Sequence, residues 1–286
     1  MRNYQGPIFV LALWRVQDII NPVIIDIHSH IYPDHLAAGT VARVCERSRI
    51  RAYADGTLQG LRHSMKMAGI DTSVVSSVAT KLDQVELIHK WFLGLRQPGI
   101  LTLATTHPDL PVDRGFVEAL KAQGFKGFKV HPDYQNFFAD EERMYPFYEA
   151  AQSAGMFVLF HAGVDRGLPD PVHATPGRLA KVHEVFPNLP MIAAHMGGES
   201  MYEETERYLL GEDIYLDTSF VLQKMPLSII ERFFKNHPVE RFLFGSDSPW
   251  TDQGEEIQFL LSLPFISEEG KERIISTNAA RLLGLS

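Results

Sequence analysis

The chain has 286 residues, of which 45% are hydrophobic and 22% are charged, and its formal net charge is −8. These fractions are ordinary for a folded protein, so wholesale disorder is excluded. The length is enough for a single α/β barrel, which needs about 250 residues. The acidic balance, with no basic tail, argues against nucleic acid as a partner, because phosphate binding needs clustered cations. Cys45 is the one cysteine, so no intrachain disulfide can form and a cytoplasmic location is expected.

Residues 1–22 precede the first strand-like run and form a predicted N-terminal extension, and residues 23–286 form the predicted domain. Arg15 and Asp18 interrupt the apolar run of residues 8–20. This run therefore falls short of the roughly 18 uncharged apolar residues of a transmembrane helix, and no membrane partner is expected. Two interpretations of the extension stay open: a segment that packs beside the domain, or a start codon placed too early.

From residue 23 onward, short apolar runs alternate with amphipathic helical patterns. Most of the runs are continuously apolar, which is typical of strands buried on both faces of a parallel sheet. Gly69 and Gly155 stand shortly before two of them, where a helix commonly ends in a left-handed residue. In chain order, the predicted strands are residues 23–28, 73–79, 100–106, 125–130, 156–161, 190–195, 214–219 and 241–246. The helical patterns between them include residues 83–96, 113–123, 141–154 and 226–236.

Eight strands, most of them followed by a helix, predict a closed (β/α)8 barrel. The alternative is an open doubly wound sheet, but the first strand lacks the glycine-rich dinucleotide loop that such a sheet carries. Residues 29–72 must hold more than one helix, and they contain several basic residues, among them Arg43 and Arg47. These side chains either form the solvated face of a surface helix or belong to a cap that holds an anionic substrate over the barrel mouth.

Six of the twelve histidines fall at the carboxyl ends of predicted strands, where the active site of an α/β barrel lies. They are His28, His30, His107, His131, His161 and His195. The eighth strand is followed directly by Asp247. Packing alone gives histidines no reason to gather at one end of the strands. Neutral imidazole nitrogens with a carboxylate oxygen suit Zn²⁺ or another divalent metal.

His28 and His30 stand two residues apart, so both side chains point to one face of an extended strand, which in a barrel is the lumen. His161 and His195 each end an apolar run. Either one alone could be a hydrogen-bonded core histidine. Together with the histidine pair and Asp247, they predict a metal site.

Lys129 lies two residues before His131 on the fourth predicted strand and should point into the barrel. A buried lysine is costly unless it has a role. It either binds a substrate carboxylate as a cation or, carbamylated by carbon dioxide, bridges two metals. His107 and His131 each precede a proline, which predicts turns, and for both a hydrogen bond that orients the loop is the favoured interpretation.

The motifs at these strand ends resemble those of the amidohydrolase superfamily. More closely, the chain is similar to the amidohydrolase-related group of metal-dependent barrel hydrolases, which also contains aminocarboxymuconate-semialdehyde decarboxylase. The resemblance covers residues 23–285. Beside the pair in His28-Ser29-His30, its motifs are Gly69-Ile70-Asp71, Gly127-Phe128-Lys129-Val130-His131-Pro132, His173-Ala174-Thr175-Pro176, Ala194-His195-Met196-Gly197-Gly198, Leu216-Asp217-Thr218-Ser219, Gly245-Ser246-Asp247-Ser248-Pro249 and Asn278-Ala279-Ala280-Arg281-Leu282-Leu283.

The resemblance implies that His28, His30 and His161 bind the catalytic metal, with Asp247 as a ligand or close neighbour. His195 would polarise the substrate carbonyl or bind a second metal. The strand position of Lys129 is where binuclear members carry a carbamylated lysine, so one or two metals per chain stay open. Zn²⁺ is the expected ion and Mn²⁺ the other candidate. Further candidates for contacts with a small-molecule substrate are His131 and His173, and a homo-oligomer is expected.

Hydrolysis of a small amide, ester or lactone is the leading functional hypothesis. In it, metal-activated water attacks the carbonyl carbon, Asp247 accepts the proton of that water, and His195 stabilises the developing oxyanion. The alternative is a metal-dependent non-oxidative decarboxylase of a small carboxylic acid, against which the short chain weighs. The second alternative is a barrel that binds a metal or ligand without catalysis, although every expected ligand and base position is occupied.

Overall fold

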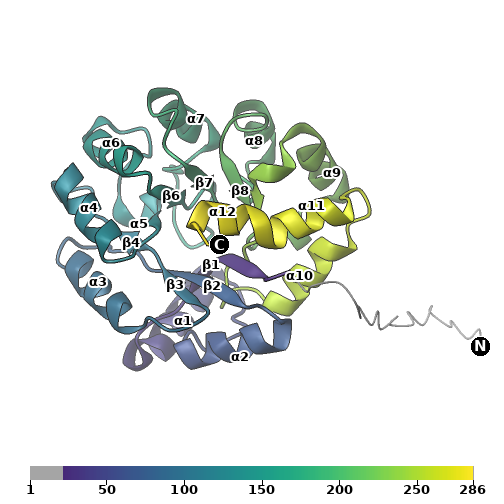
Figure 1. The fold of residues 1–286 in the computed structure, drawn as a ribbon, viewed down its shortest axis with the longest axis horizontal. Helices are drawn as coiled ribbons and strands as arrows, with labels where there is room; N and C mark the ends of the chain where they lie inside the picture. The colour runs from purple at the N-terminus through teal and green to yellow at the C-terminus, as the bar shows by residue number, and fades with distance from the viewer. Residues whose placement is uncertain (1–21, 286) are drawn as a thin grey trace, which may run out of the picture.

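Parallel strands and the helices between them form a barrel in the computed structural model, which describes residues 22–285 (Figure 1). The strands are β1 (Ile25–His30), β2 (Thr72–Ser76), β3 (Ile100–Thr102), β4 (Ala104–Thr105), β5 (Gly127–Val130), β6 (Phe157–Phe160), β7 (Met191–Ala193), β8 (Tyr215–Asp217) and β9 (Phe242–Leu243). All neighbouring strands pair in parallel, in the order β1-β2-β3 and β4 through β9.

Backbone hydrogen bonds between the first and last strands close the barrel. The N–H of Ile27 donates to the carbonyl of Phe244 at 2.9 Å, and the N–H of Asp247 donates to the carbonyl of His28 at 2.8 Å. The predicted (β/α)8 barrel is therefore confirmed. One predicted strand is corrected, because residues 100–106 form the two short strands β3 and β4, with Leu103 between them.

The helices begin and end close to the predicted patterns. They are α1 (Asp34–Ser48), α2 (Leu58–Ala68), α3 (Gln84–Gly94), α4 (Arg114–Ala122), α5 (Pro132–Gln135), α6 (Tyr145–Ala154), α7 (Pro176–Val185), α8 (Tyr202–Tyr208), α9 (Leu227–Asn236), α10 (Gln253–Ser262), α11 (Glu268–Glu272) and α12 (Asn278–Leu283). Two of them fall in residues 29–72, as predicted. Gly69 and Gly155 follow α2 and α6 in left-handed conformations, with φ of 73° and 63°.

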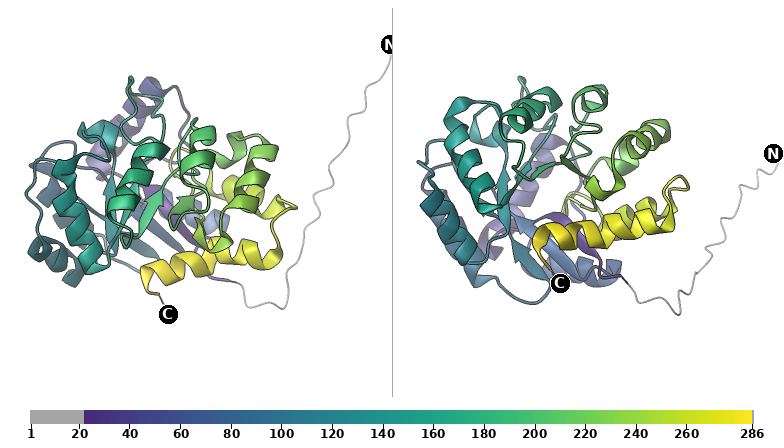
Figure 2. Two further views of the ribbon diagram at one scale, coloured as in Figure 1. Left: turned by 90° about the horizontal axis from the view of Figure 1, so that it is seen from above. Right: turned by 45° about the horizontal axis from the view of Figure 1, so that its top comes forward.

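Apolar side chains fill the lower part of the lumen. Ile27, Leu159, Ile192 and Leu243 are fully buried members of one cluster, to which Leu283 of α12 also belongs. α12 therefore covers one end of the barrel, and α1 lies at the opposite end (Figure 2). With one end packed shut, a ligand can enter the lumen at the carboxyl ends of the strands.

An irregularity in β1 sets the direction of the first two histidines. Ile27 packs in the lumen, so strict alternation along the strand would turn His28 outward. The register between β1 and β2 shifts between Asp26 and Ser29, and this shift lets His28 and His30 also face the lumen.

The predicted extension, residues 1–22, falls almost wholly outside the described residues. Among the helices of residues 22–285, none combines the length and apolar character needed to span a bilayer.

Candidate metal centre

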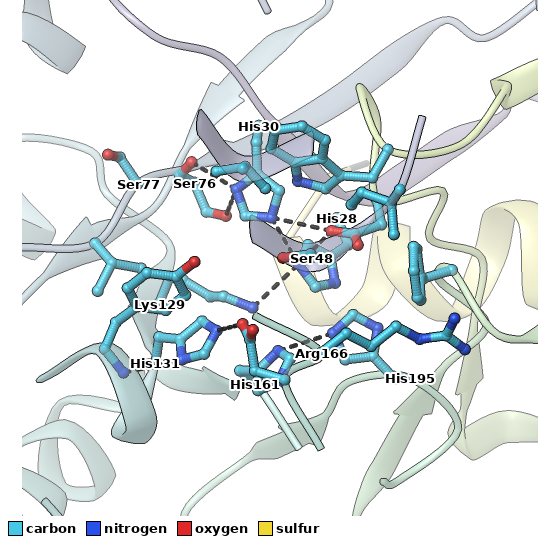
Figure 3. Close-up of a pocket in the computed structure, with 18 of the residues that line it drawn as sticks. His28, His30, Ser48, Ser76, Ser77, Lys129, His131, His161, Arg166 and His195 are labelled. Atoms are coloured by element: carbon cyan, nitrogen blue, oxygen red, sulfur yellow. Dashed lines mark hydrogen bonds and ion pairs between the residues drawn. The ribbon is translucent and has the colours of Figure 1, made fainter. Parts of the chain in front are cut away.

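A pocket of about 260 Å³ opens at the carboxyl ends of the strands (Figure 3). Helix α1 contributes Thr40, Val44 and Ser48 to its wall, so α1 does cap the barrel mouth, but with hydroxyl and apolar groups and not with its arginines. Seven predicted site residues line the pocket: His28, His30, Lys129, His131, His161, His195 and Asp247.

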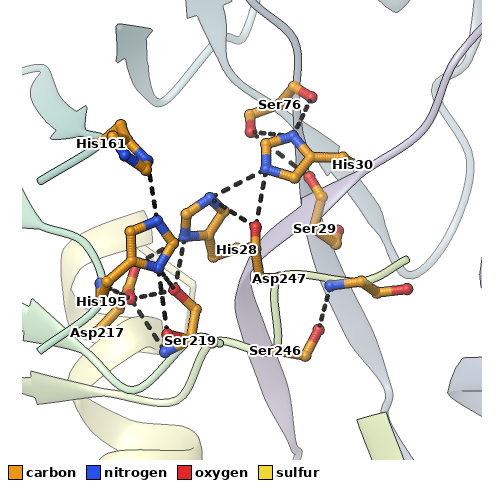
Figure 4. A network of polar contacts seen from close by, with 12 residues as sticks. His28, Ser29, His30, Ser76, His161, His195, Asp217, Ser219, Ser246 and Asp247 are labelled. Atoms are coloured by element: carbon orange, nitrogen blue, oxygen red, sulfur yellow. Dashed lines mark hydrogen bonds and ion pairs between the residues drawn. The ribbon is translucent and has the colours of Figure 1, made fainter. Parts of the chain in front are cut away.

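Three of these residues converge on one point. The Nε2 atoms of His28 and His30 are 3.1 Å apart, and Oδ1 of Asp247 lies 3.4 Å from the first and 3.1 Å from the second (Figure 4). Their potential ligand atoms form one group in which all lie within 4.8 Å of one another. The side chains come from β1 and from the loop after β9, two segments that the barrel closure brings together.

The opposite nitrogen of each imidazole is held by a buried acceptor. Nδ1 of His28 donates to Oδ2 of Asp217 at 2.9 Å, and Nδ1 of His30 donates to the carbonyl oxygen of Ser76 at 3.1 Å. A proton on each Nδ1 leaves a lone pair on each Nε2. Such contacts fix the tautomer and orientation of metal-binding histidines. Asp217 belongs to the motif Leu216-Asp217-Thr218-Ser219, but the sequence alone predicted no role for it.

This donor set fits a divalent cation. The lone pairs of His30 Nε2 and Asp247 Oδ1 face each other at 3.1 Å, although both groups are acceptors. Two imidazole nitrogens and one carboxylate oxygen are ligands that suit Zn²⁺, and the imidazoles also suit other divalent metals of the first transition row. A cation bound between these atoms relieves the repulsion between acceptors.

The charge states of the group agree with this interpretation. Burial, together with the positive charge of Lys129, lowers the pKa of His28 to about 4, so its imidazole is neutral at pH 7. Burial alone would raise the pKa of Asp247, but the neighbouring His28 and His30 hold it well below its usual range. The pocket therefore contains an ionised carboxylate and the neutral imidazole of His28 at the point where a metal would bind.

His161, the fourth predicted ligand, stands in a neighbouring group. Its Nδ1 lies 3.0 Å from Nε2 of His195, and its ring stacks on that of His131 with the centroids 3.9 Å apart. Potential ligand atoms of His131, His161 and Asp165 form a second group. Nε2 of His161 is buried and has no hydrogen-bond partner. A bound ligand or metal would satisfy this atom, but the structure does not bring it into the first group.

The imidazole of His131 has two polar contacts. Its Nδ1 accepts the backbone N–H of Tyr134 at 3.4 Å, which caps the short helix α5, and its Nε2 lies 3.2 Å from Oδ2 of Asp165. The predicted loop-orienting contact is therefore present. Because the ring also lines the pocket, the same residue is available to a substrate.

Lys129 is fully buried, and its Nζ lies 3.0 Å from Nε2 of His28. Burial lowers the pKa of the ammonium to about 8, although the carboxylates of Asp217 and Asp247 oppose the shift. This lowered pKa makes the amine more readily available for carbamylation than that of a surface lysine. The alternatives of cation and bridging carbamate both remain predictions.

His173 is not among the residues that line the pocket. Its Nδ1 and its backbone N–H both contact Oδ1 of Asp133 at 3.0 Å, and its ring stacks on Phe138. The predicted substrate contact is therefore not supported by its position. The histidine instead holds the loop after β6 against α5.

Sequence reasoning missed several residues that line the pocket, notably Asp165, Arg166 and Glu199. Nε of Arg166 donates to Oε1 of Glu199 at 2.6 Å, and the guanidinium lies over the ring of Phe220. These residues lie in loops after strands, where charged side chains are ordinary. The one sequence feature that could have indicated a functional role is that these residues follow predicted strands within a few positions.

Strained backbone conformations mark the same pocket. His195, Phe220 and Asp247 have positive φ of 59°, 65° and 69°. A left-handed conformation is uncommon for residues other than glycine, and strain of this kind clusters at functional sites. All three residues line the pocket, so the fold holds them there although residues other than glycine prefer negative φ.

A sequence profile of the family described as Amidohydrolase matches residues 25–285. The chain belongs to this family. It is accordingly a metal-dependent enzyme whose cofactor is a divalent metal, and the hypothesis of a barrel without catalysis is set aside. No curated protein matches the sequence.

Solved structures similar to this amidohydrolase share its fold at low sequence identity. 5-Carboxyvanillate decarboxylase from Sphingomonas paucimobilis is 14% identical, with a TM-score of 0.68 over 92% of this chain and 99% of its own. A manganese-bound dihydroxybenzoic acid decarboxylase from a Polaromonas species is 18% identical, with a TM-score of 0.71 over 92% and 97%. A putative 2-pyrone-4,6-dicarboxylic acid hydrolase from Pseudomonas putida is 14% identical, with a TM-score of 0.67 over 93% and 99%.

Proposed function

We propose that this amidohydrolase hydrolyses a small carbonyl compound, an amide, ester or lactone. The observation that carries the proposal is the place of Asp247, whose Oδ1 lies within 3.4 Å of both pocket-facing imidazole nitrogens and whose side chain also lines the pocket. A carboxylate held ionised at that point is placed to accept a proton from an attacking water.

The ion that we propose for His28, His30 and Asp247 is Zn²⁺, with Mn²⁺ as the other candidate. When bound, such a metal supplies a Lewis acid and lowers the pKa of a bound water toward neutrality. One ion per chain is the simplest assignment, because His161 belongs to the neighbouring group. A second ion would need the group of His131, His161 and Asp165, the group of His28, His195 and Asp217, or a carbamylated Lys129.

The other pocket residues orient the substrate. Nε2 of His195 bonds to His161, and its Nδ1 lies 3.0 Å from the hydroxyl of Ser219 and 3.2 Å from its carbonyl oxygen, so the ring is fixed at the edge of the pocket. We propose that the ammonium of Lys129 stabilises the negative charge that develops on the carbonyl oxygen, and that Nε2 of His195 adds a second donor when this oxygen replaces its contact with His161. Asp247 then returns its proton to the leaving group.

The protonation states of the pocket residues include the base that hydrolysis needs. Burial lowers the pKa values of His131 and His161 well below their usual range, so both rings are neutral, and Asp247 is ionised. Hydrolysis needs a base at this point, which Asp247 provides. Decarboxylation needs a proton donor for the carbon that loses its carboxyl group, and the ammonium of Lys129 is the donor that the pocket contains.

Decarboxylation of a small carboxylic acid is the second candidate, favoured by two cations of the pocket. Lys129 and Arg166 both line it, and either could hold a carboxylate. Two of the similar structures are decarboxylases that this chain covers almost completely, so chain length does not separate the two reactions.

The test is an assay of Zn²⁺-loaded and Mn²⁺-loaded protein on simple lactones, phenyl esters, anilides and hydroxybenzoic acids. Acid release and carbon dioxide release are followed side by side. We expect acid release, and we expect Asp247→Asn to lower its rate by at least about 100-fold, the usual size of a lost general base. Carbon dioxide release without acid release would replace hydrolysis by the second candidate. An unchanged rate in Asp247→Asn would refute the role of this carboxylate.

A further inference from the structure

A second, larger groove of about 1010 Å³ runs beside the catalytic pocket, between α1 and α3. The two share part of their lining, including Tyr32, Thr40, Val44, Val78 and Tyr134. The groove is therefore continuous with the catalytic pocket, and its volume is about four times as large.

One wall of the groove is apolar. On α3, Leu87, Ile88 and Trp91 lie at the spacing of a single helical face, and Leu36 of α1 lies in the same groove. Leu87 is 64% exposed and Leu36 is 48% exposed. Large apolar side chains gathered in an open groove commonly mark a ligand site.

The opposite wall carries two cations without anionic partners. Arg43 and Arg47, one turn apart on α1, line the groove, and within residues 22–285 neither has a carboxylate within 4 Å. Arg43 donates to the hydroxyl of Thr40 at 3.1 Å, and the guanidinium of Arg47 lies 4.8 Å above the ring of Tyr134. Of the acidic residue of the groove, Asp133, Oδ1 is engaged by His173 and Oδ2 is buried, away from the open side of the groove. An anion is therefore the ligand that this wall attracts.

We propose that the groove binds the distal part of the substrate, an apolar chain or ring system that ends in a carboxylate or similar anion. The reacting carbonyl then lies at His28, His30 and Asp247, and this placement rests on the proposed function. A molecule too long for the catalytic pocket of about 260 Å³ must extend into the groove that continues it. Arg43 and Arg47 bind its anionic end.

Three hydroxamic acids test the proposal on Zn²⁺-loaded protein, because a hydroxamate chelates divalent metals. Acetohydroxamate probes the metal centre, octanohydroxamate adds an apolar tail, and suberic monohydroxamate ends that tail in a carboxylate. Calorimetry should show octanohydroxamate binding roughly 60-fold tighter than acetohydroxamate, because its six additional methylenes, each half-buried, contribute about twofold each. The carboxylate should strengthen binding about fivefold more, and the Arg43→Met/Arg47→Met variant should lose only this second gain. Arg62→Met, on α2 outside the groove, is the matched control and should lose neither gain.

A tail effect below threefold, or a carboxylate effect that persists in the double variant, would overturn the proposal. A separate measurement distinguishes failure of the groove from failure of the metal centre. Octanoate is added to metal-free protein while tryptophan emission is followed in the wild type and in Trp91→Phe. An emission change that occurs in the wild type but not in Trp91→Phe supports binding in the groove, even where acetohydroxamate does not bind at the metal centre. No change in the wild type overturns the groove, including the case in which a second copy of the chain covers it.

Discussion

Replacing Asp217 tests the metal centre, because this residue contacts the proposed ligand His28 without lining the pocket itself. Its carboxylate is fully buried, with Oδ2 accepting from His28 Nδ1 at 2.9 Å and Oδ1 accepting the backbone N–H groups of His195 and Ser219 at 2.9 and 3.1 Å. Asp217→Asn preserves size and the Oδ1 acceptor. The substitution places an amide NH2 group opposite Nδ1 of His28. To accept a hydrogen bond from this group, Nδ1 must lose its proton, so a neutral ring would carry its proton on Nε2.

The variant should therefore lose both metal affinity and stability. A proton on Nε2 removes one of three proposed ligands, and lost partners of this kind commonly lower metal affinity by about 10- to 100-fold. A hydrogen bond to a charged group contributes about 2 kcal/mol, which sets the expected fall in the free energy of unfolding. Burial alone would raise the pKa of Asp217, but His28 holds it below its usual range, so this stabilisation is present above a pH of about 4 and lost as the pH falls further.

Zinc affinity is measured by competition with a chromophoric chelator at pH 7.5, and unfolding by urea titration of the metal-free protein. Asp213→Asn is the matched control, because Asp213 is an exposed carboxylate paired with Arg241 at the surface. It should change neither quantity by more than the small contribution of a surface ion pair. If Asp217→Asn binds zinc as tightly as the wild type does, His28 is not held by this contact and the derivation of the site is wrong.

Three further predictions concern stability. Burial raises the pKa of Glu256 to about 8, so this carboxyl stays protonated in the folded protein at pH values where it is ionised in the unfolded chain. The stability of the wild type should therefore fall by about 4 kcal/mol between pH 5 and pH 9. In urea titrations Glu256→Gln should remove that fall and exposed Glu255→Gln should not; equal behaviour would contradict the assignment. Leu159→Ala, in the lumen, should cost about 2–5 kcal/mol by urea unfolding, whereas Leu227→Ala, 58% exposed, should cost little; similar losses would disprove the packing argument. Gly163→Ala should lower the melting temperature by at least several degrees, because a Cβ there would lie 2.2 Å from a backbone nitrogen and φ is 82°; an unchanged temperature would contradict this.

The strands could be predicted because apolar runs and the glycines before them are local features of the sequence. The split of the third strand at Leu103 and the register shift between Asp26 and Ser29 could not, because both depend on how neighbouring strands pair. The shift matters for the site. His28 and His30 face the lumen together with Ile27, which strict alternation along the strand does not allow.

Only part of the candidate site could be predicted, because only some of its features are local in the sequence. Histidines that end strands are visible in the sequence, and the barrel brings His28, His30 and Asp247 together. The sequence could not reveal that His161 turns toward His195 and His131, since that depends on side-chain packing in the assembled pocket. The loop residues Asp165 and Arg166 had no distinguishing pattern.

The most direct test of the metal centre is elemental analysis by mass spectrometry, applied in parallel to the wild type and to a His28→Ala/His30→Ala variant, both purified without added metal and then reconstituted with Zn²⁺. The site described here predicts one equivalent per chain in the wild type and almost none in the variant. Wild-type protein that stays metal-free after reconstitution, or a variant that keeps a full equivalent, would contradict the assignment of His28, His30 and Asp247 as the metal ligands.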